Sequence, residues 1–360
     1  MQPYWNEEFG NPASAHLMGR RAAASVKKAR EQVASLVHSQ PGELVFTSGA
    51  TESNNLLFLG ILLTKELKRK RVVVSAIEHK SVLKPARLLA EHGFEVEHLP
   101  VLPSGVVDID AAGKLITGET LLVSVQAANN EIWTLQPIRE IAQIAHEHAL
   151  FHTDAAQFLG RLPFDIQEID CDFASFSSHK MYGPKGIGAI YVRGGGRRWP
   201  WERPFGGGGQ EIELRPGTIN VPEIVGFGTA CELASHNMSR RKEAAETSTT
   251  LFIEKLQNIE PKAQLINEPG NSLSGTISVA ILEIPSDVLI AHSKIVKLAN
   301  GAACSNGEMG SSHVIKDIGY DNYIMRVCYS NIIRGKTRPL MILSLSLMHY
   351  KRQEVSYEYV

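Results

Sequence analysis

The chain has 360 residues, of which 43% are hydrophobic and 21% are charged, and its formal net charge is −1. This is the composition of a soluble globular protein that is long enough for one large and one smaller domain. A net charge near zero gives no overall attraction to nucleic acid or to an acidic membrane. The N-terminus lacks a signal-peptide pattern, and no apolar run is long enough to span a bilayer. We therefore predict a cytoplasmic protein without a direct nucleic-acid or membrane partner.

The cysteines argue against both a metal site and a disulfide scaffold. There are four of them in a long chain, with no paired CxxC spacing: Cys171, Cys231, Cys304 and Cys328. We predict a protein of a reducing compartment that holds no metal.

Short apolar runs alternate with amphipathic stretches over the first two-thirds of the chain. The pattern predicts, in order, a helix over 22–37, a strand over 44–46, a helix over 51–69, a strand over 72–76, a helix over 81–92, a strand over 121–126, a helix over 138–149, and strands over 150–153, 173–176 and 188–192. Strands rich in Val and Ile between helices indicate an open, mostly parallel sheet that is covered on both faces. In such a sheet, ligands bind beyond the carboxyl ends of the strands.

The pattern changes after the last of these strands. Residues 193–209 are rich in Gly, Arg, Trp and Pro, which predicts a long functional loop. A domain boundary is expected near 235–241, followed by a charged helix over 240–259 and β-like segments around 275–282. The basic run over 65–71 is interpreted as a solvated helix end rather than a binding site.

The first motif, TSGATESNN over 47–55, follows a strand and opens a helix. Small residues let the backbone approach an anion, and a helix N-terminus offers free N–H groups. The motif fits a phosphate site and an ordinary helix N-cap equally well.

The second motif, HTDAAQ over 152–157, places Asp154 at the end of an apolar run. A buried carboxylate needs a partner, and a protonated pyridine nitrogen, an Arg side chain or a backbone N–H can each provide one. Taken alone, this motif favours a structural role.

The third motif, SFSSHKMYGPKG over 175–186, places Lys180 just past a strand end, among hydroxyl groups and a histidine. This fits a lysine that forms a Schiff base beside a phosphate, although lysines in surface loops are common. The fourth motif, GAACSNG over 301–307, places Cys304 in a small polar loop, where a cysteine can be reactive. Cys171, Cys231 and Cys328 are interpreted as packing residues.

Together these motifs resemble the NifS/IscS-like cysteine desulfurases of the class V aminotransferase group. The resemblance runs from about Phe9 to Arg326 and also includes GNPAS (10–14), IEHK (77–80), ANNEI (128–132), GGGGQE (206–211) and RPGT (215–218). It implies pyridoxal-phosphate (PLP) fold type I: a large α/β domain with a mostly parallel seven-stranded sheet between helices, over 1–238, and a smaller α+β domain over 239–360.

The resemblance also implies roles for individual residues. Lys180 would bind the PLP aldehyde, Asp154 the pyridine nitrogen and Gln157 the phenolic oxygen, while His79 would stack on the ring and move protons. The phosphate would be bound by Ala50, Thr51, Ser177 and His179, and by Thr218 of the second subunit of a homodimer. Asn130 and Arg326 would bind the substrate carboxylate; a guanidinium group can bind a carboxylate with two hydrogen bonds.

Cys304 would be the nucleophile that takes sulfur from L-cysteine as a persulfide, leaves L-alanine, and passes the sulfur to a protein acceptor. Iron–sulfur cluster assembly, tRNA thiolation, nitrogenase maturation and DNA phosphorothioation remain open as destinations. A selenocysteine lyase and a non-catalytic sulfur-transfer scaffold are the alternatives.

The chain departs from the family pattern in three places. It begins just before GNPAS, without the strand and small-residue turn with which family members open. Trp133 stands where the family has a glycine after ANNEI. Residues 331–360 are interpreted as an atypical tail unrelated to the family.

Overall fold

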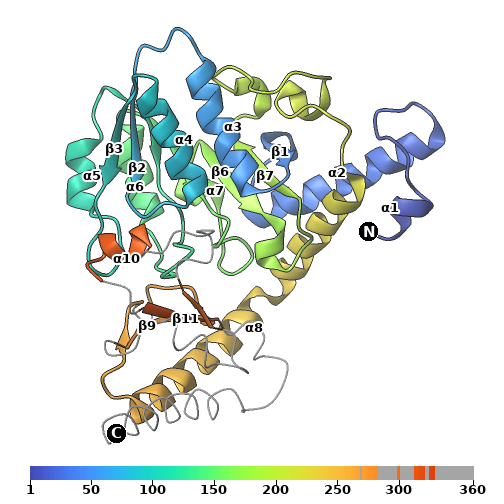
Figure 1. Cartoon of the computed structure of the whole chain (residues 1–360). Coiled ribbons are helices and arrows are strands. Elements are labelled where there is room, and N and C mark those ends of the chain that lie inside the picture. The colour runs from blue at the N-terminus through green and yellow to red at the C-terminus, as the bar shows by residue number, and fades with distance from the viewer. Residues whose placement is uncertain (268–269, 282–297, 301–311, 321–323, 329–360) are drawn as a thin grey trace, which may run out of the picture. The chain divides into compact units, whose positions relative to one another are not determined.

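The computed structural model describes residues 1–267, 270–281, 298–300, 312–320 and 324–328. The chain forms two compact units (Figure 1). The first contains Met1–Pro100, Val107–Ala128 and Gln136–Met238, and the second contains Val101–Val106, Asn129–Leu135 and Ser239–Val360.

The first unit is built on a seven-stranded sheet with the spatial order β1-β7-β6-β5-β4-β2-β3. The strands are β1 (Leu44–Thr47), β2 (Arg71–Ser75), β3 (Glu95–Leu99), β4 (Thr120–Ser124), β5 (Leu150–Asp154), β6 (Phe173–Ser177) and β7 (Gly188–Val192). Neighbouring strands from β3 to β6 pair in parallel, whereas β7 is antiparallel to both β6 and β1. The predicted mostly parallel, seven-stranded sheet is confirmed.

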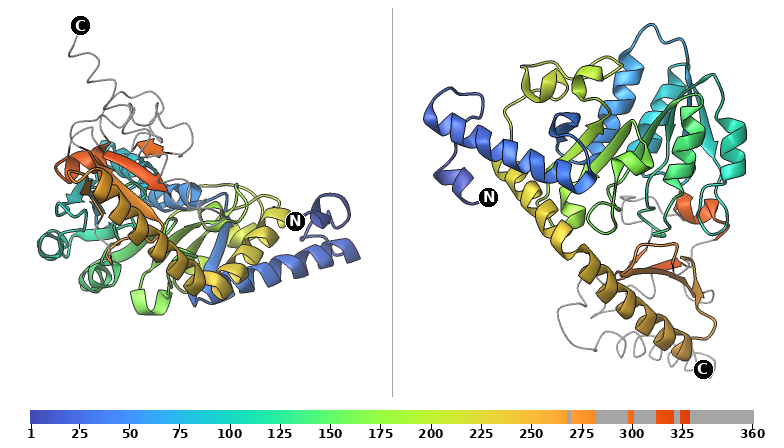
Figure 2. Two further views of the ribbon diagram at one scale, coloured as in Figure 1. Left: turned by 90° about the horizontal axis from the view of Figure 1, so that it is seen from below. Right: turned by 180° about the vertical axis from the view of Figure 1, so that it is seen from behind.

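Helices of the first unit connect and cover these strands. They are α1 (Pro3–Asn6), α2 (Leu17–Val37), α3 (Ala50–Leu63), α4 (Lys80–Glu91), α5 (Ile109–Leu115), α6 (Ile138–His146) and α7 (Ile166–Ile169), with short 3-10 helices at Pro41–Glu43, Ser178–Met181, Gly196–Arg198 and Gln210–Glu213. The long α8 (Val221–Ile259) begins in this unit. Its first half runs beside α2 (Figure 2), where the Gln32 amide donates to Glu232 at 2.9 Å.

One large apolar cluster joins α3 and α4 to one face of the sheet. Leu57 and Ile61 of α3 and Val82 of α4 are fully buried with Val72 and Val74 of β2. Side chains alternate between the two faces of a strand, and Val73, between these two valines, is also fully buried. The sheet is therefore covered on both sides, as parallel strands require.

Two predicted boundaries were wrong. The helix expected over 51–69 ends at Leu63, because the hydroxyl of Thr64 donates to the Gly60 carbonyl at 2.8 Å and accepts from the Glu202 N–H, also at 2.8 Å. The basic run that follows lies outside the helix. The helix expected over 240–259 begins at Val221, because the buried Ile224, Phe227, Cys231 and Ala234 continue its apolar face.

The segment 193–209, which was predicted to be a long functional loop, contains part of the core. Trp199 and Trp201 are both buried, and the Trp201 ring stacks on Phe173 of β6 with 5.3 Å between centroids. This packing accounts for the two tryptophans of the segment, and its functional role stays a prediction.

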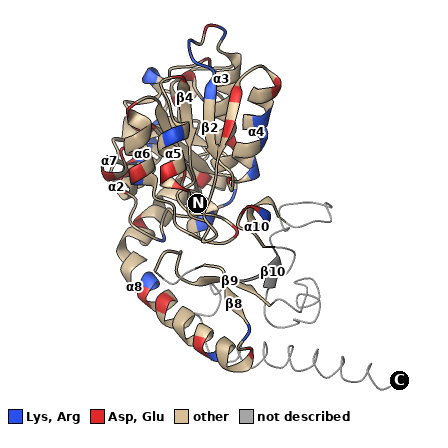
Figure 3. Cartoon of the chain, turned by 90° about the vertical axis from the view of Figure 1, so that its left-hand side faces the viewer, with Lys and Arg blue, Asp and Glu red and all other residues tan. Residues whose placement is uncertain are grey.

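The second unit contains a four-stranded antiparallel sheet in the order β10-β11-β9-β8. Its strands are β8 (Gln264–Leu265), β9 (Thr276–Ala280), β10 (Leu298–Asn300) and β11 (Ile324–Cys328), with the short helix α10 (His313–Asp317). The second half of α8 carries exposed charges of both signs (Figure 3).

Trp133 lies in the loop 129–135 of the second unit. The Asn129 carboxamide oxygen accepts from the Glu131 and Ile132 N–H groups, and the Trp133 carbonyl accepts from Leu273 N–H at 3.0 Å. Trp133 has φ 64°, in the left-handed region where a side chain is strained and glycine is favoured. This geometry explains why a glycine suits the position.

Within the described residues, no helix is long and apolar enough to cross a membrane. Nor do three His, Cys, Asp or Glu side chains of that part of the chain gather where a metal ion could be held.

His152 is buried at the centre of the sheet between two serines. On β5, its Nδ1 lies 2.8 Å from the Ser124 hydroxyl of β4, and its Nε2 lies 3.1 Å from the Ser175 hydroxyl of β6. Burial lowers the pKa of His152 from 6.5 to about 3, because the charged imidazolium would lose its hydration. The folded protein therefore keeps this ring neutral at pH values where the unfolded chain protonates it.

We expect stability to fall as the pH drops from about 6.5 toward 3. Between these values the unfolded chain binds the proton and the folded protein does not, which costs at most about 1.4 kcal/mol per pH unit. The free energy of unfolding of the cofactor-free protein is measured in urea at pH 7 and pH 5. From pH 7 to pH 5 it should fall by about 2 kcal/mol less in His152→Gln than in the wild type. The exposed His236→Gln on α8 is the control. Equal losses in all three proteins would contradict the prediction.

Two substitutions of Trp133 separate backbone strain from packing. Trp133→Ala and Trp133→Gly remove the same buried ring, but only glycine relieves the left-handed backbone. We expect the glycine variant to be more stable than the alanine variant by about 1 kcal/mol in the free energy of unfolding. An alanine variant as stable as the glycine variant would show that the residue is not strained.

Candidate active site

The carboxyl ends of β1, β5 and β6 lie at one edge of the first unit's sheet and bring the predicted motifs together. Asp154 is the last residue of β5, and Ser177 is the last residue of the neighbouring β6. Thr47, the last residue of β1, lies at the same end of the sheet, because Gly188 of β7 pairs with both Thr47 and Ser177. His79 follows the end of β2 and caps α4. This is the edge at which the parallel sheet was expected to bind a ligand.

A cradle of small residues surrounds the Ser177 hydroxyl. The Ala50 N–H, at the first position of α3, donates to Ser177 Oγ at 2.9 Å. Gly49 has φ 149°, and a Cβ there would lie 3.3 Å from the same oxygen. A Cβ at Gly188 would lie 2.6 Å from the Gly49 Cα. Only glycine at these two positions lets the start of α3 approach β6 so closely.

Lys180 lies in the 3-10 helix that directly follows β6 and is partly exposed. The neighbouring His179 is exposed. Partial burial, with smaller contributions from the charges of Lys180 and Lys185, lowers the pKa of His179 and favours its neutral form. A neutral imidazole beside a lysine can still donate one hydrogen bond to an anion.

The Asp154 carboxylate is buried, and both of its oxygens accept hydrogen bonds. Oδ1 accepts from Ala156 N–H at 2.9 Å, and Oδ2 accepts from the Asn54 amide at 2.7 Å. Gln157, one residue beyond Ala156, is also buried, and its Oε1 has no hydrogen-bond partner among the described residues. A carboxylate and an unsatisfied amide at one strand end suit an aromatic ligand with polar substituents.

A second buried carboxyl group lies near Asp154. Burial and the charge of Asp154 raise the pKa of Glu78 well above its usual value, although N–H groups of Gln126 and His79 act in the opposite direction. This shift favours the neutral form of Glu78, which avoids a second negative charge beside Asp154. The sequence gives no signal for Glu78, because a single Glu beside a His is not typical of any functional motif.

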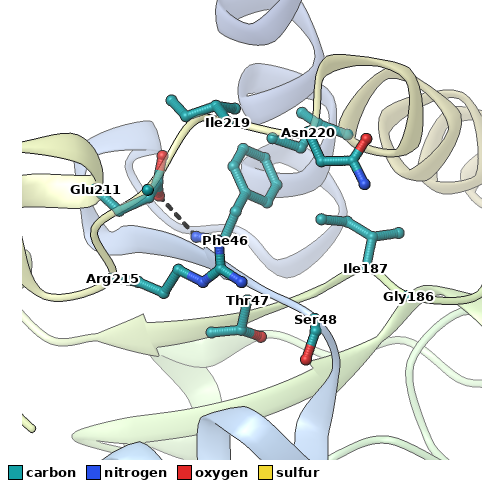
Figure 4. A pocket seen from close by; sticks show the side chains of 11 residues that line it. Phe46, Thr47, Ser48, Gly186, Ile187, Glu211, Arg215, Ile219 and Asn220 are labelled. Carbon is teal, nitrogen blue, oxygen red and sulfur yellow. Dashed lines mark hydrogen bonds between the residues drawn. The ribbon is translucent and has the colours of Figure 1, made fainter. Parts of the chain in front are cut away.

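A pocket beside the cradle is lined by Thr47, Ser48 and Arg215 (Figure 4). Arg215 Nε donates to Glu52 at 2.8 Å. Burial alone would raise the pKa of Glu52, but the hydrogen bonds from Arg215 and Ser48 outweigh it and lower the pKa. Arg215 is therefore held across the first turn of α3.

The far wall of this pocket is fixed by Glu211. Its buried carboxylate pairs with Arg30 and accepts from the Phe46 N–H at 2.7 Å, the bond dashed in Figure 4. Glu211 and the two residues after it all have left-handed φ angles between 46° and 59°. Such strain persists only where the surroundings impose it, as these contacts do.

The remaining predicted site residues are not brought into the cradle by a described contact. Thr51, in the first turn of α3, and Thr218, in the loop before α8, are exposed. Asn130 belongs to the second unit, as does the backbone of Arg326 in β11. Cys304 lies outside the described residues.

Comparison with known proteins decides the family. The aminotransferase class-V model matches residues 1–329. The chain is 40% identical to the mitosomal cysteine desulfurase of Encephalitozoon cuniculi over 98% of this chain and 82% of that protein. It is 41% identical to cysteine desulfurase IscS 1 of Archaeoglobus fulgidus over 89% of this chain and 83% of that protein.

The chain belongs to the NifS/IscS-like cysteine desulfurases of the aminotransferase class-V family. A solved structure described as a NifS-like protein superposes with a TM-score of 0.88 and 33% identity, covering 98% of this chain and 94% of the other. The alignment with the Encephalitozoon protein covers more of the chain than residues 1–329 and therefore extends into 331–360. The family model ends at residue 329, and the interpretation of 331–360 as an atypical tail stays a prediction.

The residues of the cradle fit the cofactor that membership in this family implies, which is PLP. Ser177, the N–H groups at the start of α3 and the two glycines suit a phosphate. The buried Asp154 suits a protonated ring nitrogen, and the Gln157 amide suits a polar ring substituent. Lys180, in the 3-10 helix that follows β6, supplies an amine.

Proposed function

We propose that the protein is a PLP-dependent cysteine desulfurase that converts L-cysteine to L-alanine and takes the sulfur onto Cys304. The observation that carries this proposal is the pairing of β5 with β6, which sets Lys180 just beyond the strand next to the one that ends in the buried Asp154. Similarity to cysteine desulfurases over nearly the whole chain supports the same activity.

PLP, when bound, would supply an electron sink for the negative charge left at the substrate Cα. Each protein group has one task toward it. Asp154 would accept a hydrogen bond from the ring nitrogen and so keep that nitrogen protonated. Gln157 would donate to the phenolic oxygen, and Lys180 would supply the amine that holds the aldehyde carbon. Ser177, the Ala50 N–H, Thr51 and His179 would hold the phosphate.

The substrate is held and attacked by residues of the second unit. Arg326 and Asn130 bind the carboxylate of L-cysteine, the guanidinium through two parallel hydrogen bonds. The Cys304 thiolate attacks the substrate sulfur, so that an S–S bond forms and the C–S bond breaks. The electron pair of that C–S bond stays on the three-carbon skeleton, which takes up a proton and leaves as L-alanine. His79, against the ring face, moves protons.

We further propose a homodimer in which Thr218 of one subunit reaches the phosphate bound by the other. The first unit would be the cofactor-binding domain (1–238) and the second the domain with the catalytic cysteine (239–360). The persulfide on Cys304 would pass its sulfur to a protein acceptor, and an external thiol could release it as sulfide.

We expect Cys304→Ala to keep the yellow cofactor and to lose sulfide release. Without the nucleophile, alanine and sulfide formed from L-cysteine in the presence of a reductant should fall by more than about 10³-fold. Cys231→Ala is the matched control, because this buried thiol has a pKa that burial raises far above neutrality. Wild-type protein should form alanine and sulfide in equal amounts. Full activity in Cys304→Ala would overturn the persulfide route.

We expect Lys180→Ala to lose the visible absorbance band of lysine-bound PLP, because no other amine takes its place. The exposed Lys185→Ala, five residues further on, should keep the band. An unchanged spectrum in Lys180→Ala would assign the Schiff base to another lysine. A wild-type protein that shows the band but does not turn over L-cysteine, in contrast, would support the non-catalytic scaffold.

A further inference from the structure

A continuous line of hydrogen bonds connects Asp154 to His79 through two residues without an assigned role. The amide nitrogen of Asn54, on α3, donates to Asp154 Oδ2 at 2.7 Å and to the Ser81 hydroxyl at 2.8 Å. The Ser81 hydroxyl lies 2.8 Å from Nδ1 of His79. Asn54 and Ser81 are both buried.

The orientation of the Asn54 amide follows from its partner. If the amide were turned over, its oxygen would face the Asp154 carboxylate, and two acceptors would repel each other. The amide nitrogen must therefore face Asp154, and its second hydrogen is directed to Ser81. Because the Ser81 oxygen accepts this hydrogen bond, its own hydrogen is available for Nδ1 of His79.

The backbone fixes the role of His79 Nδ1. The Ser81 N–H, which can only donate, points at this nitrogen from 3.1 Å as part of the N-cap of α4. Nδ1 must therefore present its lone pair, and the Ser81 hydroxyl adds a second donor to the same lone pair. In a neutral imidazole with an unprotonated Nδ1, the hydrogen resides on Nε2.

We propose that Asn54 is a positioning residue that, through the Ser81 hydroxyl, strengthens the preference of His79 for the Nε2–H tautomer, which the Ser81 N–H also favours, and links this preference to the Asp154 carboxylate. The role of the link toward the cofactor rests on the proposed function, in which Asp154 and His79 contact the edge and the face of the PLP ring. The Asn54 amide then orients both Asp154 and His79, the two residues that contact the ring, and His79 presents a proton donor at Nε2.

The test is nitrogen NMR of the full-length protein labelled with ¹⁵N-histidine, with and without PLP, together with PLP affinity from the visible band. His79 is assigned by comparison with His79→Gln. In the wild type, we expect Nδ1 at the frequency of an unprotonated nitrogen and Nε2 at that of a protonated one. In Asn54→Ala, we expect the two frequencies to move toward each other and PLP to bind about tenfold more weakly, because a hydrogen bond to a charged group is lost.

Asn237→Ala is the matched control: this half-buried asparagine donates to a helix carbonyl on α8 and should change neither readout. A wild-type His79 protonated at Nδ1, or an Asn54→Ala protein with unchanged frequencies and affinity, would overturn the proposal. If Asn54→Ala does not fold, Ser81→Ala replaces it, because it removes only the hydroxyl between the amide and the ring. This variant is judged by the two nitrogen frequencies of His79, and unchanged frequencies would overturn the proposal. The tautomer is read without turnover, so a failure of desulfurase activity would leave this result intact.

Discussion

A carboxylate buried at the end of a central strand is the constraint around which the first unit's site is arranged. Burying a charge is costly unless donors surround it, so the position of Asp154 requires N–H groups from more than one element. The chain supplies one from the turn after β5 and one from α3. Because α3 must therefore approach the strand ends, its first turn also reaches Ser177 of β6. The sites for a ring nitrogen and for a phosphate thus share one helix.

The sequence predicted this arrangement through features whose physical cause is local. Apolar runs of Val and Ile located the central strands to within a residue or two, and parallel pairing requires their carboxyl ends to share an edge. Motifs far apart in the chain, such as those containing Asp154 and Lys180, could therefore be expected to meet. Family resemblance then gave roles to residues whose local patterns left several interpretations open.

Other features could not be predicted because they depend on tertiary contacts. Edge strand β3 was missed because Glu95 and Glu97 interrupt its apolar pattern; both carboxylates lie near Arg71 on the neighbouring strand. The roles of Asn54 and Ser81 were missed because a serine or an asparagine in a helix is commonplace. Only the fold brings them between Asp154 and His79. Asn54 lies inside the TSGATESNN motif, one turn after Ala50, and this spacing was the available signal.

Glu211 and Trp133 both have left-handed backbone conformations, but for different reasons. Glu211 is held there by its carboxylate, which pairs with Arg30 and accepts from the backbone of β1. The contacts of the Glu211 side chain therefore hold its backbone in the left-handed conformation. At Trp133, by contrast, the backbone carbonyl accepts from the Leu273 N–H, a contact that a glycine would also supply.

The cysteines illustrate how environment rather than residue type determines reactivity. Cys171 lies in the turn between α7 and β6 and Cys231 inside α8, and burial raises the pKa of both thiols far above neutrality. Neither can supply a thiolate, the form that attacks sulfur. A persulfide carrier must also leave the site where it is formed in order to reach an acceptor, which a residue packed in a helix or beneath a strand cannot do. Of the cysteines in the chain, Cys304, among small and polar neighbours, has the sequence context that this task demands.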